Sequence, residues 1–207
     1  MMSTRRCTRC ARALVLCVLA ALSACSRLAE EAPYVAPRPG TVFHYRGMEN
    51  RITGSQGWRT TFVDGLGREG LRWAVFIPDD ARHPAEIDSA ELARLWPLKV
   101  GNEAVVRVKH GPEVYRWEFR VGWKGSITVP AGRYDTYMVQ AVQQPELVRD
   151  PRTAYTAMYT WWYAPAVPGV VRFITKYVGG PAAGRVIASE LEKLDAPAPA
   201  PAAAGTP

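Results

Sequence analysis

The stretch "YRWEFRVGW", residues 115–123, decides the fold class of this 207-residue chain. Large apolar residues occupy every second position from Tyr115 to Trp123, while Arg116, Glu118 and Arg120 occupy positions between them. Alternation with period two is typical of a β-strand that has one buried and one solvated face. The stretch therefore predicts a strand that lines an apolar core.

The same alternation predicts strands in much of the remaining chain. In residues 155–163 it places Trp161 and Tyr163 on one face and Trp162 on the other, and residues 170–178 repeat the pattern. Further strands are expected at 41–46, 58–63, 71–77, 104–109, 126–129, 134–142 and 185–194. The last of these also has apolar residues at helical spacing, so a helix is the alternative there.

One helix and several turns are indicated by the residues at their ends. Asp88 stands three residues before Glu91, which is the spacing of a capping box, and Pro97 is expected to end the helix. The sequence "VPAG" (129–132) has Pro and Gly where a tight turn favours them, which predicts a hairpin. Together these features predict a mainly β fold, a curled antiparallel sheet that forms an incomplete barrel with one short helix.

The N-terminus is typical of an exported protein. Four arginines precede a 12-residue apolar run (13–24), which is shorter than the roughly 18 residues that span a bilayer. "LSAC" (22–25) resembles the bacterial lipobox, which implies that residues 1–24 are a signal peptide and that Cys25 is acylated. All four cysteines lie at or before Cys25. An ordinary secretory signal with a chance cysteine, or an uncleaved anchor, is the alternative.

Composition divides the rest of the chain. Without residues 1–24, which hold four of the 26 Lys and Arg, 22 basic residues stand against 19 acidic ones, so no nucleic-acid partner is indicated. The Pro-containing segment 25–40 is expected to be the lipidated cysteine and a flexible tether. Residues 41–195 are the expected β-rich periplasmic domain, and 196–207 a disordered Pro/Ala tail.

Two motifs favour turns over binding sites. "GLGREG" (65–70) matches a dinucleotide fingerprint, but a strand follows it where that fingerprint needs a helix, so a hairpin loop is expected. "IPDDARHPAEID" (77–88) gathers acidic residues and His83 without any known metal-loop spacing, and Pro-Asp-Asp is ordinary turn chemistry. We therefore expect neither a metal nor a cofactor.

No catalytic motif stands out in the predicted domain. Its four serines, Ser55, Ser89, Ser126 and Ser189, lie outside any nucleophile motif, and its histidines lack a companion motif. A carboxylate pair assembled only in space stays open as an alternative, because such pairs leave no local signature. The expectation is a protein that is not an enzyme.

The aromatic residues are the strongest candidates for a binding role, with seven Trp and nine Tyr in the chain. They either fill the core of the curled sheet or line an apolar groove for a lipid chain or a protein segment. The candidates are Trp117, Trp123, Trp161, Trp162 and Tyr163, with Trp162 the foremost for a groove because its strand neighbours face the other way. Arg116, Arg120 and Lys124 form a basic stripe that either meets an anionic head group or is a solvated face.

Three segments in order carry a resemblance to a known family: "WPLKVG" (96–101), "ITVPAGRYDTYMV" (127–139) and "WWYAPAVPGVVRF" (161–173). They resemble bacterial envelope domains of unknown function, except that Pro168 alters the last loop. The resemblance implies a fold similar to that of the lipoprotein localisation factors, an open barrel that can hold acyl chains. The residues expected to set turns in these segments are Pro97, Gly101, Pro130, Gly132, Pro165 and Gly169.

The sequence thus predicts a lipid-anchored lipoprotein of the bacterial envelope, attached to the membrane through Cys25 and carrying a non-catalytic binding domain. Ser26 after the cysteine resembles the sorting pattern for the outer membrane, which implies its inner leaflet, facing the periplasm. The expected ligand is a lipid chain or an apolar segment of an envelope protein. The alternatives are an assembly accessory that binds partners through strand faces and edges, and a hydrolase with a spatially assembled acid pair.

Overall fold

The computed structural model describes residues 30–197. The predicted signal peptide, the predicted acylation of Cys25 and the tail from residue 198 lie outside the described residues. Within them no helix is both long enough and apolar enough to span a membrane.

Fourteen strands and one short helix make up the described chain. The helix is α2 (Ser89–Ala93). The strands are β1 (Glu31–Ala32), β2 (Val42–Tyr45), β3 (Met48–Gln56), β4 (Arg59–Asp64), β5 (Glu69–Trp73), β6 (Ile77–Asp79), β7 (Glu86–Ile87), β8 (Leu98–Lys99), β9 (Glu103–His110), β10 (Glu113–Val129), β11 (Gly132–Leu147), β12 (Thr156–Ala164), β13 (Gly169–Gly179) and β14 (Val186–Asp195).

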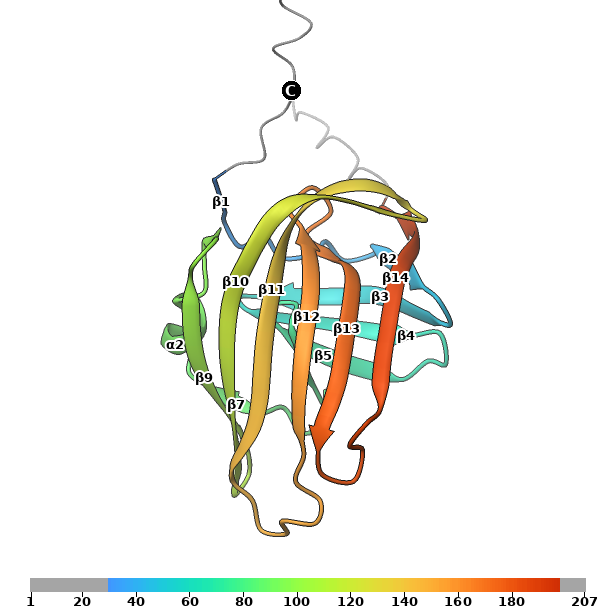
Figure 1. Ribbon diagram of the computed structural model, residues 1–207. Coiled ribbons are helices and arrows are strands. Elements are labelled where there is room, and N and C mark those ends of the chain that lie inside the picture. Colours follow the sequence, from blue (N-terminus) through green and yellow to red (C-terminus); the bar gives the residue numbers. More distant parts are fainter. Residues whose placement is uncertain (1–29, 198–207) are drawn as a thin grey trace, which may run out of the picture.

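Twelve of these strands form one antiparallel sheet in the order β6-β5-β4-β3-β2-β14-β13-β12-β11-β10-β9-β7. The chain runs through β2 to β6 toward one edge, crosses to the opposite edge, and returns from β7 to β14, which pairs with β2. In Figure 1, β9 to β14 form a curved front wall, and β2 to β5 run across behind it. The predicted mainly β class, curled antiparallel sheet and short helix are confirmed, and the sheet is not closed into a barrel.

The longest hairpin is larger than the sequence predicts. β10 has 17 residues and β11 has 16, so the strand expected at 115–123 and the one expected at 126–129 are continuous. A register shift between Val121 and Trp123 marks the bend that lets the hairpin arch over the ends of β12 and β13. At the tip, the N–H of Ala131 donates to the carbonyl of Leu191 in β14 at 3.0 Å. The hairpin therefore ties the front wall together at one end (Figure 1).

The predicted helix is present, but only half of its capping box forms. Asp88 Oδ1 accepts a 2.8 Å hydrogen bond from the N–H of Ala90, as an N-cap should. The Glu91 carboxylate accepts instead from the N–H of Arg107 in β9 at 3.0 Å, so it fastens the helix to the sheet. α2 ends at Ala93, before Pro97.

The segment 185–194 is a strand, β14, as expected, and not the alternative helix, because it pairs with both β13 and β2. One further expectation needs correction. The folded domain begins at β1, about ten residues before residue 41: β1 pairs with β8, and the ring of Tyr34 lies 4.6 Å from that of Trp58 and 5.1 Å from that of Trp96. Residues 31–40 are therefore packed against the domain and are not a flexible tether.

Buried apolar residues form two hydrophobic clusters. The main cluster contains the inward residues of β9 to β12, the segment 74–77, and the α2 region with Leu92 and Leu95. Its rings stack in series, with centroids 4.8 Å apart for Trp117 and Tyr159 and 5.1 Å apart for Tyr159 and Trp161. The second cluster comprises Phe43, Tyr45, Ile52, Val129, Ala164, Val171 and Leu191.

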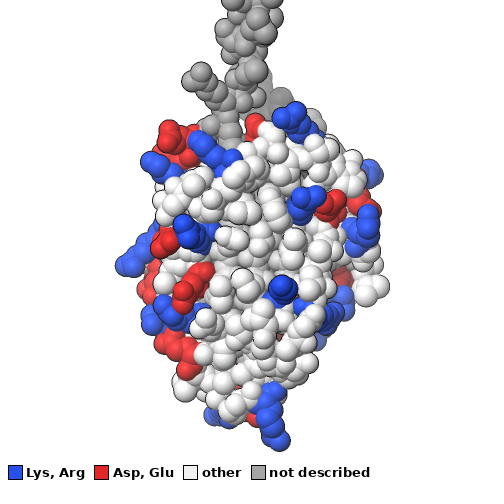
Figure 2. Space-filling view, viewed as in Figure 1, with Lys and Arg blue, Asp and Glu red and all other residues white. Residues whose placement is uncertain are grey.

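The outer face of β9 to β14 is less polar than the alternation predicts. Figure 2 shows this face in the view of Figure 1, with uncharged residues over most of its middle and charged residues mainly toward its margins. Five of the exposed residues there are large and apolar: Val105, Met158, Ile174, Val178 and Val186. Both the inner and the outer face of this wall therefore carry large apolar residues.

Candidate functional site

A cavity of about 250 Å³ lies between the two clusters, where β2, β3 and β5 face the inner side of β12 to β14. Apolar side chains make up most of its wall: Met48, Val75, Phe76, Trp161, Phe173 and Ile187. Pockets of this kind, concave and mostly apolar with few polar groups, are the usual sites of small-molecule binding. The cavity is therefore the candidate functional site.

Strand register places the front wall of the cavity. Trp161 of β12 pairs with Phe173 of β13, and Tyr159 pairs with Thr175, which pairs in turn with Ile187 of β14. Paired residues on adjacent antiparallel strands point to the same side. The alternation that predicts these strands thus also sets two rows of side chains along the cavity.

The rear wall includes a sharp turn between β5 and β6. Ala74 and Val75 have positive φ angles of 45° and 65°, which are uncommon for residues other than glycine and most unfavourable for a β-branched one. Hydrogen bonds hold the turn, from the N–H of Ala74 to the Trp58 carbonyl at 2.7 Å and from that of Phe76 to the Trp73 carbonyl at 3.0 Å. The turn places Val75 and Phe76 against the cavity, and strain of this kind gathers at functional sites.

Arg72 is the cationic residue of the lining. Its guanidinium lies 4.9 Å from the centre of the Phe62 ring. In the orientation that satisfies both polar atoms of its amide, the buried Asn50 accepts a 3.2 Å hydrogen bond from Arg72 Nη2. Within the described part of the chain, no carboxylate forms an ion pair with Arg72.

The tyrosines around Arg72 stay neutral. Burial raises the pKa of Tyr45, and the neighbouring Arg72 opposes that rise. Burial also raises the pKa of Tyr159. Their hydroxyls donate to the Val170 carbonyl at 2.6 Å and to Gln143 Oε1 at 2.7 Å, respectively. Arg72 therefore carries the charge of the cavity lining.

A smaller cavity of about 20 Å³ shares Tyr45, Arg72 and Val75 with the first and continues past Phe43 and Gly169. A Cβ atom on Gly169 would lie 2.5 Å from the Phe43 ring. Gly169, expected to set a turn, therefore serves a close approach between β13 and β2. Arg72 stands at the junction of the two cavities.

The predicted aromatic candidates separate by face. Trp117, Trp161 and Tyr163 are buried in the main cluster, and Trp161 also lines the cavity. Trp162, the residue expected to face a groove, lies on the other face of β12, where the Arg172 guanidinium is 5.5 Å from the centre of its ring. Trp123, at the bend of β10, is 40% exposed. The residue that lines the cavity is thus Trp161 and not Trp162.

Arg72 itself gave little signal in the sequence. It stands between Leu71 and Trp73 in a strand where alternation predicts that it faces water. Leu71 and Trp73 are indeed buried in the main cluster, but on the opposite face of β5 Arg72 lines the cavity, whose front wall includes Phe173 of β13. A cation between large apolar residues in a strand that ends in a predicted tight turn is the only hint.

The predicted turn residues lie in turns or irregular segments, apart from Gly132 and Gly169, which begin β11 and β13. Gly101 and Gly132 have φ angles of 95° and 135°, which favour glycine. Pro130 occupies the two-residue connection of the long hairpin, and Pro165 lies in the turn between β12 and β13. These positions shape the sheet and do not contact the cavity.

The acidic segment 77–88 contains β6, a connection over residues 80–85, β7 and the N-cap of α2. Asp79 Oδ2 accepts from Trp73 Nε1 at 2.9 Å and from the N–H of Ala85 at 2.8 Å. Among the described residues, no three His, Cys, Asp or Glu side chains come together as metal ligands would. The buried Asp79 carboxylate therefore serves the fold.

Ion pairs with acidic neighbours balance the charges of two arginines of the predicted basic stripe. Arg116 Nη1 lies 2.5 Å from Glu118 Oε1, and Arg120 Nε lies 3.7 Å from Glu103 Oε1. This arrangement favours the interpretation of a solvated face.

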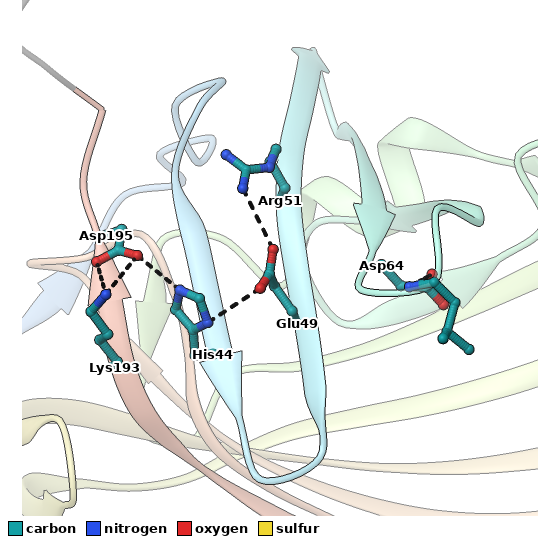
Figure 3. A network of polar contacts seen from close by, with 7 residues as sticks. His44, Glu49, Arg51, Asp64, Lys193 and Asp195 are labelled. Carbon is teal, nitrogen blue, oxygen red and sulfur yellow. Dashed lines mark hydrogen bonds and ion pairs between the residues drawn. The ribbon is translucent and has the colours of Figure 1, made fainter.

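A separate polar network lies where β2 joins β14 (Figure 3). His44 contacts Asp195 at 2.9 Å and Glu49 at 3.4 Å, and Lys193 contacts Asp195 at 2.9 Å. Hydrogen bonds from Lys193 and then from His44 hold the pKa of Asp195 below its ordinary value. These side chains are partly exposed and lie away from the cavity lining, so the network is a clamp between two strands.

Comparison with known proteins shows distant similarity in shape alone. No protein-family profile and no curated protein match the chain. The hypothetical lipoprotein YmcC from Escherichia coli is 10% identical, with 96% of this chain and 100% of that one covered and a TM-score of 0.45.

Two further structures come from other bacteria. A candidate exported protein with a YmcC-like fold from Bacteroides fragilis is 13% identical, and a candidate lipoprotein from Parabacteroides distasonis is 15% identical. Each covers 79% of this chain and 99% of its own, with a TM-score of 0.41. At these values the similarities carry no argument about function.

Proposed function

We propose that this protein is a lipid-anchored protein of the bacterial envelope whose domain binds a single apolar chain in the concave cavity and catalyses no reaction. The observation that carries the proposal is the cavity itself, about 250 Å³ with a wall of aromatic and aliphatic side chains. Its volume is just below the roughly 300–1,000 Å³ of drug-sized ligand pockets, which suits one chain better than a whole diacyl lipid. The bound apolar chain is part of a lipid or of an apolar protein segment.

The anchor rests on the lipobox-like residues 22–25 and is independent of the cavity. Five residues lie between Cys25 and Glu31, where β1 begins, and the six residue steps from Cys25 to Glu31 span at most about 20 Å. An acylated Cys25 therefore holds the domain beside the membrane that supplies apolar chains. We place this anchor in the inner leaflet of the outer membrane, with the domain in the periplasm.

Binding is tested with an uncharged ligand. All described strands lie within residues 31–195, so a chain that starts at Ser26 retains the whole described fold. This chain is exported, purified without detergent and titrated with decan-1-ol under native mass spectrometry. We expect one bound molecule in the wild type.

Two neighbouring positions of β14 supply a matched pair of variants. Ile187 lines the cavity, whereas Val186 points outward and is 54% exposed. Ile187→Phe narrows the cavity and should weaken decan-1-ol binding, and Val186→Phe should preserve it. Failure of the wild type to bind, or equal binding by Ile187→Phe, would refute the cavity as the binding site.

The anchor has its own test in cells fed an alkyne analogue of palmitate. Cys25→Ser should accumulate as an unprocessed precursor without label, because the acylated thiol is gone. Cys17→Ser, in the apolar run, should be processed and labelled as the wild type is. Label and normal processing in Cys25→Ser would show that Cys25 is not the lipidation site.

A second candidate function is an assembly accessory, favoured by the exposed apolar residues of the outer face (Figure 2). Met158, near the middle of that face, is 47% exposed. If the face binds an envelope protein, one fixed partner should crosslink to the wild type and be lost from Met158→Glu. The same partner should persist in Ile187→Phe, which alters only the cavity.

A further inference from the structure

The charge of Arg72 is not balanced by the described part of the protein. Its strand neighbours across β4 and β6 are Thr60 and Pro78, and neither is acidic. An arginine stays protonated even when partly buried, so its charge requires a partner or water. In an apolar cavity, such a cation favours an anionic ligand group.

The surrounding contacts hold the guanidinium in place and leave its charge uncompensated. The Phe62 ring packs on it at 4.9 Å, and Asn50 takes one of its five N–H donors. Gly70 leaves room for this arrangement, because a Cβ there would lie 2.3 Å from the Phe62 ring. The guanidinium is thus oriented by neutral groups, which is the preorganised state that a binding site needs.

We propose that the ligand of the cavity is a single-chain carboxylate of the fatty-acid type. Its chain lies on Trp161, Phe173 and Ile187, and its carboxylate pairs with the Arg72 guanidinium at the junction of the two cavities. This inference rests on the proposed function and adds the chemistry of the head group.

A carboxylate fits this position better than a phosphate. The planar fork of a guanidinium matches the two oxygens of a carboxylate, and one cation balances one negative charge. The Tyr45 and Tyr159 hydroxyls already donate to Val170 and Gln143, so they do not supply the additional donors that a phosphate monoester would need. The remaining wall is apolar, which matches an alkyl chain.

The test compares ligands that share one chain and differ in the head group. Decanoate, decan-1-ol and decyl phosphate are titrated by calorimetry at pH 7 into the chain from Ser26. We expect decanoate to bind at least tenfold more tightly than decan-1-ol, and decyl phosphate more weakly than decanoate. Added sodium chloride should lower the affinity for decanoate and leave the affinity for decan-1-ol unchanged.

Two arginine variants separate the head-group contact from the fold. Arg72→Met keeps an unbranched apolar stem and removes the guanidinium and its charge, so it should lower decanoate affinity to that of decan-1-ol. Binding of decan-1-ol by this variant shows that its cavity is still formed. Arg59→Met, which alters an exposed arginine over Trp73, should behave as the wild type.

The outcomes separate this inference from the proposed function. Equal affinities of the wild type for decanoate and decan-1-ol, or a preference for decanoate that survives in Arg72→Met, would refute the carboxylate ligand. Either result would leave the cavity as the binding site for an apolar chain. If decyl phosphate binds more tightly than decanoate, the head group of the ligand is a phosphate and the proposed carboxylate is wrong. If no ligand binds to the wild type, the proposed function fails and this inference fails with it.

Discussion

The two halves of the concave side differ although the same alternation builds both. Along β9 to β11 the inward residues, such as Trp117 and Val139, are buried in the main cluster. Along β13 and β14 the inward Phe173 and Ile187 are only partly buried and border the cavity. We call these the filled half and the open half.

The difference arises from what covers each half. α2 packs on β9, and the buried Leu92 of this helix and Leu95 just after it complete the main cluster. The open half is covered by β2, β3, β5 and the turn after β5, and the strands lie across it as a second layer of sheet, as Figure 1 shows. The comparison teaches that burial depends on the covering element as much as on the strand pattern.

The largest expected effect on stability comes from replacing one aromatic residue in each half by alanine. Trp117→Ala should lower the free energy of unfolding by about 3–5 kcal/mol, because it leaves a hole among stacked rings. Phe173→Ala should cost only about 1–2 kcal/mol, because part of that ring already borders empty space. Urea unfolding followed by circular dichroism measures both. Equal losses would mean that the two halves are equally packed.

Enlarging a side chain gives a smaller effect and a sharper contrast. Val139→Phe should destabilise the filled half by about 1–3 kcal/mol, because no room exists for the added atoms. Ile187→Phe should change stability by less than about 1 kcal/mol, because the ring enters the cavity. Thermal unfolding of the two variants in parallel provides the measurement. Strong destabilisation by Ile187→Phe would contradict an open half.

The smallest effect is expected at the polar network where β14 meets β2 (Figure 3). The pKa of Asp195 is lowered in the folded state, so its contribution is present above the ordinary value of 3.8 and is lost as pH falls through the lower, folded value. Asp195→Asn should therefore reduce stability slightly at pH 7 and converge with the wild type in acid. Unfolding midpoints between pH 2 and 7 show this, and high salt should shrink the difference. A large loss would mean that this clamp, and not packing, holds the open half.

Sequence patterns predicted local features well where a single neighbour decides the outcome. Asp88 caps α2 because an N-cap needs only the N–H groups of the next turn. Residues 65–68 of the glycine-rich segment connect β4 and β5, and Asp64 accepts from the N–H groups of Leu66 and Arg68 at 2.9 Å. Such features depend on a few adjacent residues.

Features that depend on distant contacts escaped the sequence. Tyr34 looked like part of a tether, but it is packed because Trp58 and Trp96 arrive from other strands. Glu91 satisfied a capping pattern, yet its carboxylate accepts a hydrogen bond from the backbone of β9, because the fold brings the N–H of Arg107 within 3.0 Å. Trp162 was expected to face a groove, although the cavity lies on the side of its neighbour Trp161.

The sequence by itself determined the mainly β class, because alternation of large apolar residues is stable only with one face of a strand buried. It also determined the lipobox-like motif near the N-terminus, because such a motif consists of adjacent residues and does not depend on the folded domain. Only the tertiary structure decided which face is concave, how far the domain reaches toward Cys25, and that Arg72 meets an apolar cavity. The physical reason is that alternation divides a strand into two faces, while the curl of the sheet and the layer laid across it decide what each face meets.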